Sequence, residues 1–271
     1  PLFIYRNTIR KATKKSDFDF NDLRKKKMTI YLGISPDKLA QAQPILNIFF
    51  AQLIAINTKV LPPRDKKIKH PCLLLLDEFT APGTINILQK SVSYMASYWL
   101  KTLIIFQSVS QLEENQPNGY GKEGSKTILQ NHALKIWFAP EDPEVAESLS
   151  KRLGYMTVKS TSTNRSSSAG GFGRNSFGHN ESDQKRALML PQELLELPYK
   201  KQLITKANNK PIMCDKILYY KEPYFINKLK KLSITLENAG AIPQQDDFNA
   251  AIFSNELNIP IPNQRSVNGK N

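Results

Sequence analysis

Two acids and one amide follow short apolar runs in a pattern that could bring them together at a phosphate. Asp77 and Glu78 come directly after four leucines, and Gln107 follows the next apolar run, residues 102–106. The carboxyl ends of parallel strands meet at the edge of an open α/β sheet where ligands bind. There Asp77 could hold Mg²⁺ through water, Glu78 could orient or deprotonate a water molecule, and Gln107 could contact a terminal phosphate.

Each of these features alone has a plainer explanation. Exposed acids at the end of a buried strand are at least as common as a metal-binding pair, and a glutamine at a strand end is mostly a turn residue. Two consecutive strands that end in Asp-Glu and then in Gln, joined by one helix, are much less often accidental. We therefore interpret Asp77, Glu78 and Gln107 as candidate catalytic residues, with Asp77 also the candidate Mg²⁺ ligand.

Hydrophobic periodicity predicts the elements that would position these residues. Unbroken apolar runs predict strands at 28–34, 71–79, 102–106 and 133–139. Apolar residues spaced by three and four predict helices at 37–56, 85–99, 126–130 and 143–153. The alternating order predicts a doubly wound, mostly parallel α/β sheet, with helices over both faces of the strand at 71–79.

Composition divides the chain into a basic segment 1–27, an α/β part 28–231 and a tail 232–271. In the segment 160–182, 16 of 23 residues are Ser, Thr, Gly or Asn, which indicates a flexible loop. Two strands, 202–205 and 212–220, are expected after it. The tail is polar, with four acids and two bases, and we expect it to be disordered.

Charge and cysteine usage limit the possible functions. Lys and Arg number 38 against 24 acids, a formal charge of +14, which favours an anionic partner. Arg24, Lys25, Lys26 and Lys27 form the densest basic run and are candidate nucleic-acid contacts. The two cysteines and three histidines lie far apart without metal-ligand spacing. The longest nearly apolar stretch, 45–56, is shorter than the ~20 residues that a bilayer requires, so we expect no membrane span.

The sequence lacks the phosphate-binding loop that such a site needs. The only near match to GxxxxGK[ST] begins at Gly119, and Ser125 separates its second glycine from Lys126. It also follows a Pro-Asn turn instead of a strand, so we reject it. Either the protein is no nucleotide hydrolase, or the loop lies in an upstream part of a longer protein that the start at Pro1 suggests.

Several segments in order resemble landmarks of the type IV secretion coupling proteins of the TraG/TraD family. They are IYLGISPDKL, LLLLDEF, IIFQSVSQLE, ILQNHALKIWFAPED, SLSKRLGYMTV, ALMLPQELLELP and PIMCDKILYY, spread over residues 17–226. The resemblance implies the C-terminal part of an ATPase that uses ATP and Mg²⁺ to bring DNA–relaxase complexes or protein effectors to secretion channel components. It implies a partial RecA-like P-loop NTPase domain without its Walker A strand, loop and helix.

The family resemblance carries further expectations. Asp77 and Glu78 are similar to the Walker B pair, and Gln107 to the glutamine of the next strand. The family assembles as homo-hexamers on the cytoplasmic face of the bacterial inner membrane, through an N-terminal anchor that this chain would lack. The chain alone is therefore expected to be inactive.

Some of the family's positions have no counterpart here or no assigned role. Some members carry a candidate arginine finger where this chain has Ala96, and Lys101 is the nearest cation. A lysine does not reproduce the planar fork of arginine, and Arg152 and Arg165 are only guesses for that role. Asn131 resembles a landmark whose role we do not assign.

Three alternatives stay open at the level of sequence. The chain could be a non-catalytic basic nucleic-acid-binding module, or another DNA-pumping ATPase of the FtsK/HerA kind. In the first case lysines and aromatics near Tyr219, Tyr220, Tyr224 and Phe225 could stack on a single strand, although alternating aromatics are more often core. The third alternative is a scaffold whose tail recruits substrates through a segment that folds on a partner.

Overall fold

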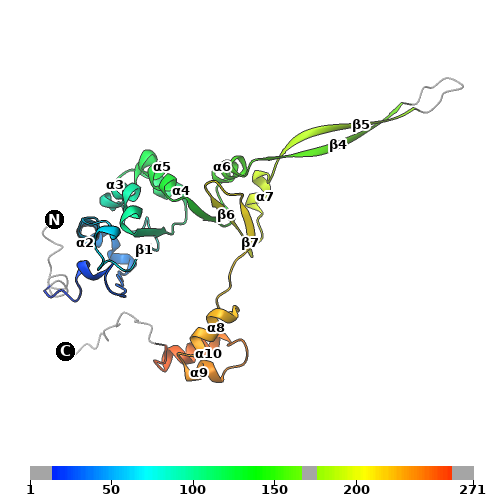
Figure 1. Ribbon diagram of the computed structural model, residues 1–271. Coiled ribbons are helices and arrows are strands. Elements are labelled where there is room, and N and C mark those ends of the chain that lie inside the picture. Colours follow the sequence, from blue (N-terminus) through cyan, green and yellow to red (C-terminus); the bar gives the residue numbers. More distant parts are fainter. Residues whose placement is uncertain (1–13, 167–175, 258–271) are drawn as a thin grey trace, which may run out of the picture. The chain divides into compact units, whose positions relative to one another are not determined.

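The computed structural model describes residues 14–166 and 176–257, and the chain divides after Ala133 into two compact units (Figure 1). The first unit contains helices α2 to α5 and two strands. Its α-helices are α2 (Leu39–Asn57), α3 (Asn86–Met95), α4 (Val109–Glu113) and α5 (Gly121–Asn131). Its strands are β1 (Cys72–Leu76) and β2 (Leu100–Ile104), and short 3₁₀ turns lie at Phe20–Asp22, Pro36–Lys38, Pro62–Arg64 and Ala96–Tyr98.

Strands β1 and β2 are parallel neighbours joined through α3, as the sequence predicts. Their register places Cys72 opposite Leu100 and Leu76 opposite Ile104. One face of this pair, with Leu74 at its centre, packs into the core of the first unit. That core also takes side chains from α2, α3, α4 and α5, namely Leu46, Phe50, Leu53, Ile54, Leu88, Met95, Leu112 and Ile128.

The expectation that helices cover both faces of β1 is wrong for the described residues. Leu73 and Leu75 alternate with buried Leu74, and with Leu103 and Ile105 they are 44–58% exposed. The side chains of a strand alternate between two faces, so an unbroken leucine run has apolar groups on both. We refer to Leu73, Leu75, Leu103 and Ile105 as the bare face of β1–β2.

Two further features of the first unit differ from the prediction. Residues 28–34 form no strand, because none of the described strands pairs with them, although Ile30 and Ile34 pack against the core. Helix α2 has 19 residues with a mean hydropathy of 1.5, long and apolar enough by composition to cross a membrane. A single such helix is weak evidence for a membrane span; 22% of its apolar window is buried, and Leu53 and Ile54 pack in this core.

The second unit contains two sheets and several helices. Its strands are β3 (Leu134–Trp137), β4 (Tyr155–Ser166), β5 (Ser176–Ala187), β6 (Lys201–Lys206) and β7 (Ile212–Asp215). Its helices are α6 (Pro143–Leu153), α7 (Pro191–Leu195), α8 (Pro223–Lys230), α9 (Ile234–Asn238) and α10 (Gln245–Phe253). Helix α6 begins as its sequence predicts, since Asp142 accepts a hydrogen bond from the Glu144 backbone N–H.

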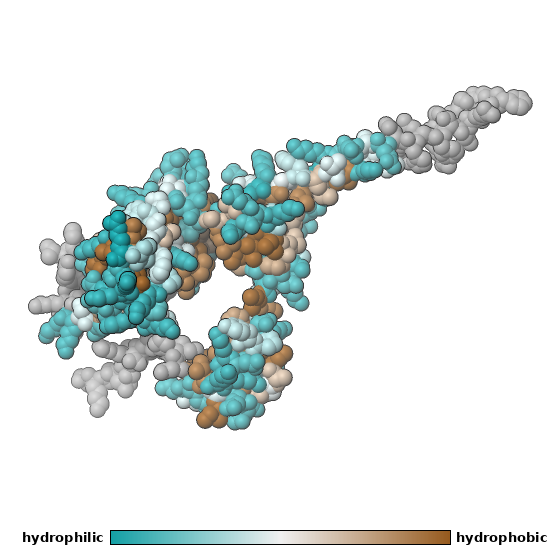
Figure 2. Space-filling model, in the orientation of Figure 1, coloured by the Kyte–Doolittle hydropathy of each residue, from teal (hydrophilic) through white to brown (hydrophobic). Residues whose placement is uncertain are grey.

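Strand β3 does not continue the parallel sheet predicted from the alternating order of elements. It pairs with β6 in antiparallel fashion, and β6 pairs with β7, which gives a separate three-stranded sheet. Trp137 and Leu203 on one face pack against α6 and α7, while Leu134, Ile136, Phe138 and Ile212 stay exposed on the other. Figure 2 shows apolar side chains gathered over β6 and β7.

The segment predicted as a flexible loop, 160–182, instead belongs largely to a hairpin. Strands β4 and β5 pair with each other in register from Tyr155 opposite Ala187 to Ser166 opposite Ser176. Every second residue of each strand exchanges backbone hydrogen bonds with the other strand, so a polar sequence can still form regular structure. Residues 167–175 lie outside the described residues.

The tail expected to be disordered from residue 232 instead contains helices α9 and α10. Leu236, Ala251 and Leu257 are buried together, with Leu229 and Phe248 packed against them. The Glu256 carboxylate accepts hydrogen bonds from the hydroxyls of Ser233 and Thr235, which ties the end of this segment to the start of α9. Residues 258–271 lie outside the described residues.

Candidate functional site

The structure brings the three predicted catalytic residues to one edge of the β1–β2 pair. The backbone N–H of Ile105 donates to Leu76 and that of Phe79 donates to Ile105, so the two chains stay aligned beyond their last strand residues. The Gln107 amide nitrogen donates to both carboxylate oxygens of Glu78, at 3.2 and 3.3 Å. The prediction of neighbouring parallel strands with adjacent polar ends is therefore confirmed, while the catalytic roles stay predictions.

The backbone at Glu78 has a conformation that side chains with a Cβ rarely adopt. Its φ is +50°, in the left-handed region, and its carbonyl accepts from the Ala81 N–H in a tight turn. A residue other than glycine in this region costs of order 1 kcal/mol and is found preferentially at functional sites. The turn leaves the side chains of Asp77 and Glu78 exposed at the end of β1.

An aromatic stack fixes the chain directly after the acid pair. Phe79 is buried and stacks on Tyr120 with 5.1 Å between ring centroids and 9° between planes. The Tyr120 hydroxyl accepts a hydrogen bond from the Ile85 N–H at 3.1 Å. Burial of this phenol raises the pKa of Tyr120 to about 12, so it stays neutral at physiological pH. The acid-bearing turn is thus attached to the segment that precedes α5.

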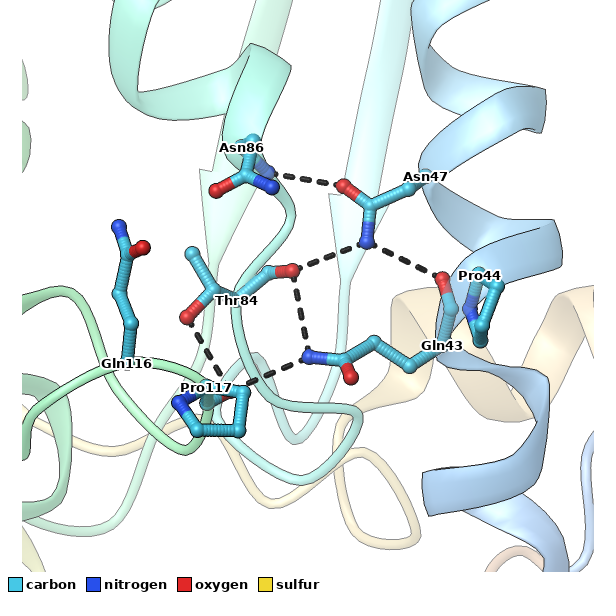
Figure 3. A pocket seen from close by; sticks show the side chains of 7 residues that line it. All are labelled: Gln43, Pro44, Asn47, Thr84, Asn86, Gln116 and Pro117. Atoms are coloured by element: carbon cyan, nitrogen blue, oxygen red, sulfur yellow. Dashed lines mark hydrogen bonds between the residues drawn. The ribbon is translucent and has the colours of Figure 1, made fainter. Parts of the chain in front are cut away.

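A network of polar side chains holds the other end of the same loop (Figure 3). Asn47 on α2 donates to the Thr84 carbonyl at 3.0 Å and accepts from the Asn86 N–H at 2.9 Å. Gln43, one turn earlier, donates to the Pro117 carbonyl at 3.1 Å, and the Thr84 hydroxyl donates to the same carbonyl. These contacts connect α2 to the start of α3 and to the segment before α5.

The pocket beside this network does not contain the candidate catalytic residues. It has a volume of about 170 Å³ and is lined by Gln43, Pro44, Asn47, Thr84, Asn86, Gln116 and Pro117. Most of the polar groups that face it already bond to one another. We therefore assign the pocket a structural part, which is to fix the loop between β1 and α3.

The position of Gln107 is set by the helix that follows it. Ser108 is the N-cap of α4, and its hydroxyl accepts from the Ser110 N–H at 3.1 Å. On the same helix, Gln111 accepts a hydrogen bond from the Thr80 hydroxyl at 3.2 Å. The segments after β1 and β2 therefore contact each other through the side-chain pairs Glu78–Gln107 and Thr80–Gln111 as well as through the backbone.

The donor set at this edge fits a magnesium ion whose ligands come mainly from water and phosphate. Among residues 14–166 and 176–257, no group of three or more His, Cys, Asp or Glu side chains could enclose a metal. Mg²⁺ is commonly held by one or two carboxylates plus waters and substrate phosphates. Asp77 could supply such a carboxylate, while Glu78 is engaged by Gln107.

The rejected phosphate-loop match is helical in the structure. Gly121–Asn131 forms α5, so Gly124 and Lys126 lie within a helix and not in an anion-binding loop. A Cβ at Gly124 would lie 2.8 Å from the amide nitrogen of Gln89 on α3. Gly124 therefore lies close to the Gln89 side chain of α3.

The predicted nucleic-acid role is wrong for Arg24. Its side chain is 5% exposed and donates to the Asn57 side chain at 3.1 Å, to the Tyr98 carbonyl at 2.9 Å and to the Val60 carbonyl at 3.3 Å. Burial lowers its pKa from the ordinary arginine value. Lys26 and Lys27 are exposed, and Lys26 pairs with Asp22 at 2.8 Å.

The remaining candidate positions lie on other elements of the two units. Ala96 begins the exposed turn after α3, and Asn131 donates to the Thr127 carbonyl within α5. Arg152 is exposed in the last turn of α6, in the second unit. The side chain of Arg165 lies outside the described residues.

Sequence reasoning missed Tyr120 and Asn47 as supports of the site. Asn47 did carry a signal, since it is a polar residue within the nearly apolar stretch 45–56. Buried polar side chains are nearly always hydrogen-bonded, so such a residue indicates a specific contact. Nothing local to Tyr120 indicates its stack on Phe79, because the two residues are 41 positions apart.

The fold is similar to that of solved plasmid coupling proteins. The structure described as plasmid coupling protein TrwB in complex with ADP and Mg²⁺ gives a TM-score of 0.54 at 16% identity, covering 78% of this chain and 46% of that one. The trigonal form of TrwBdeltaN70 in complex with sulphate gives 0.55 at 16% identity, covering 75% and 44%. These likenesses concern the fold, and they confirm a partial RecA-like α/β architecture.

Sequence comparison then gives the family. Residues 2–240 match the family described as Type IV secretory system Conjugative DNA transfer. Protein VirD4 of Rhizobium radiobacter is 30% identical over 250 residues, which are 92% of this chain and 34% of that protein. Conjugal transfer protein TraG of Escherichia coli is 26% identical over 247 residues, covering 83% and 38%.

The chain therefore belongs to the type IV secretory system conjugative DNA transfer family. It spans about a third of the length of the curated relatives that it matches. The resemblance to coupling proteins inferred from the sequence landmarks is confirmed.

Proposed function

We propose that this chain forms part of a coupling protein that drives conjugative DNA transfer with the free energy of ATP hydrolysis. The observation that carries the proposal is the contact between Gln107 and Glu78 across the ends of two parallel strands. A strained turn at Glu78 and the supports around Phe79 and Thr84 add to it, because they hold an exposed acid pair in place.

Each residue has a distinct proposed part. Asp77 would hold Mg²⁺ through water, and this ion would supply charge stabilisation at the nucleotide phosphates. Glu78 would orient or deprotonate the attacking water. Gln107, which contacts Glu78 here, would keep that carboxylate in position and meet the terminal phosphate with its amide. The phosphate-binding loop would come from a segment outside this sequence, so the chain alone would not turn over ATP.

The cellular setting is proposed from the family. The chain would act within a homo-hexamer at the cytoplasmic face of the bacterial inner membrane, attached by an anchor outside this sequence. It would deliver a DNA–relaxase complex or a protein effector to secretion channel components. The family match over residues 2–240 favours this role over that of another DNA-pumping ATPase.

Steady-state ATPase assays of the full-length coupling protein test the catalytic assignment. Glu78→Gln is expected to lower kcat by about 100- to 10,000-fold while nucleotide binding persists, because it removes the group that activates water. Asp77→Asn is expected to weaken Mg²⁺-dependent nucleotide binding. Glu114→Gln is the matched control, since this exposed acid lies at the end of α4, away from the strand ends.

Two results would contradict the assignment. Turnover of Glu78→Gln at the level of the parent protein would remove Glu78 from the chemistry. A Gln107→Ala variant with unchanged kcat and KM would show that the contact with Glu78 has no part in turnover.

A further inference from the structure

Six of the exposed aromatic rings of the second unit lie on segments next to β7 and α8, although large aromatic side chains are usually buried. Four of them lie in the connection from β7 to α8 and in the first turn of α8, and two lie beside the end of β7. They are 37–80% exposed and comprise Phe138, Tyr199, Tyr219, Tyr220, Tyr224 and Phe225. The sequence-based preference for a core role of the tyrosines near residue 220 is wrong, because β7 ends at Asp215.

A lysine ammonium lies over four of these six rings. Lys216 Nζ is 4.3 Å from the Phe138 ring centroid and 4.5 Å from that of Tyr199. Lys228 Nζ is 4.4 Å from the Tyr224 centroid and donates to its hydroxyl at 2.8 Å. The Lys221 ammonium is 5.8 Å from the centroid of the Tyr220 ring. We call these six rings and three lysines the aromatic–lysine surface.

Backbone hydrogen bonds hold the segments that carry the aromatic–lysine surface. The Lys216 N–H donates to the Lys200 carbonyl at 2.7 Å, which holds the chain as it leaves β7. The N–H groups of Lys221 and Glu222 both donate to the Leu218 carbonyl, which forms the turn before α8. Ile226 of α8 is buried, while Tyr224 and Phe225 in the first turn of this helix stay exposed.

The segment that carries five of the six rings is strongly basic. Residues 199–231 contain nine lysines and two acids. One of the acids, Asp215, is paired with Lys201 at 2.8 Å. A polyanion would therefore meet ammonium groups at the same places where it meets aromatic rings.

We propose that the aromatic–lysine surface binds single-stranded nucleic acid by stacking bases on the rings and pairing phosphates with the lysines. Proteins that bind single strands without sequence preference combine these two elements, and stacking requires unpaired bases. The cores of protein–protein interfaces are depleted in lysine, whereas lysines here lie over the rings themselves. The inference draws its biological setting from the proposed function, but the contact itself requires neither nucleotide nor Mg²⁺.

Fluorescence anisotropy with a labelled oligothymidine and the 271-residue chain tests the proposal without any ATPase readout. We expect the single strand to bind more tightly than a duplex of the same length. Combined replacement Tyr219→Leu, Tyr220→Leu and Tyr224→Leu should lower the affinity by about 5- to 150-fold for each stacked base lost. Because these side chains are exposed, thermal unfolding should be unchanged.

The contribution of the lysines is measured separately, through the salt dependence of the affinity. Combined replacement of Lys216, Lys221 and Lys228 by glutamine should reduce the slope of log affinity against log salt by about 2, since each phosphate contact on a single strand contributes about 0.7. Tyr31→Leu is the matched control for the rings, because this exposed tyrosine lies in the first unit. Glutamine at Lys25, Lys26 and Lys27 tests the other basic segment in the same assay.

The alternatives give different results. Equal binding of duplex and single strand with no effect of the tyrosine replacements would overturn stacking. Loss of binding on replacing Lys25–Lys27 alone would transfer the site to the first unit and overturn the proposal. Association with anionic vesicles or with itself, lost in the tyrosine variant while the oligonucleotide does not bind, would identify a membrane or protein surface instead. A failed ATPase assignment would leave all of these outcomes unchanged.

Discussion

Replacing Arg24 by methionine should destabilise the first unit more than any other single change in the basic run. The guanidinium donates to Asn57 Oδ1, to the Tyr98 carbonyl and to the Val60 carbonyl, and so joins the N-terminal segment to the end of α2 and to the turn after α3. Methionine keeps an apolar stem of similar reach but provides no donor. The three acceptors would then lack the partner that they have in the structure.

The magnitude follows from two opposing effects. Hydrogen bonds to a charged group contribute about 1.5–3 kcal/mol each, so the loss of three would cost about 4–9 kcal/mol. Removing the buried charge also removes its desolvation penalty, which is several kcal/mol in proteins. We expect the bonds to outweigh the penalty, with a net loss of about 2–4 kcal/mol. Lys27→Met, at an exposed position of the same run, should change stability by less than about 0.5 kcal/mol.

Urea denaturation followed by tryptophan fluorescence measures this loss. The chain has two tryptophans, Trp99 in the first unit and Trp137 in the second, so a Trp137→Phe background leaves Trp99 to report on the unit that contains Arg24. Trp99 follows Tyr98, whose carbonyl accepts from Arg24. The midpoint should fall in Arg24→Met and stay near the parent value in Lys27→Met.

One result would refute this reasoning. If Arg24→Met and Lys27→Met had the same midpoint while only Arg24→Met lost affinity for nucleic acid, Arg24 would be a phosphate contact and its buried bonds would contribute nothing.

Three further predictions concern groups elsewhere in the two units. Hydrogen bonds from Ser233 and Thr235 lower the pKa of Glu256 to about 2. The contribution of this carboxylate to the stability of α9–α10 should therefore be present above pH 4.5 and lost as the pH falls toward 2. Amide hydrogen exchange of α9–α10 measures this loss, and Glu256→Gln should not show it. The raised pKa of Tyr120 predicts a contribution to stability that is lost as the pH rises from 10 to about 12. In thermal unfolding, Tyr120→Phe should lack this dependence on pH and should be about 1 kcal/mol less stable than the parent at neutral pH. Asn47→Leu should cost about 1–3 kcal/mol, measured as faster hydrogen exchange at the Asn86 amide, because the Asn86 N–H loses its acceptor and the Thr84 carbonyl loses one of its two side-chain donors.

The candidate site was predictable because it depends on short-range rules. An apolar run marks each strand, a polar residue marks its end, and a single helix between two strands makes them parallel neighbours. Those rules place Asp77, Glu78 and Gln107 together without any knowledge of the rest of the chain. They do not give the left-handed backbone of Glu78, which arises from a turn closed by Ala81.

Features that depend on distant residues were not predictable. The hairpin β4–β5 pairs Thr161 with Glu181 across twenty positions, and its Ser- and Thr-rich composition is the same as that of a disordered segment. The alternating order of elements placed β3 in the parallel sheet, but its partner is β6. In the basic run, the high density of charge correctly predicts that Lys26 and Lys27 are exposed, but it wrongly predicts the same for Arg24. The burial of Arg24 depends on acceptors 33 to 74 positions away.

The bare face of β1–β2 has a consequence for how the protein behaves as a colloid. Exposed leucines attract one another in water, while a net charge of +14 keeps separate molecules apart. Added salt shortens the range of the repulsion and leaves the apolar attraction intact. Light scattering of the chain should therefore rise with ionic strength, and solubility should be greatest in dilute buffer, the reverse of the salting-in shown by many charged proteins.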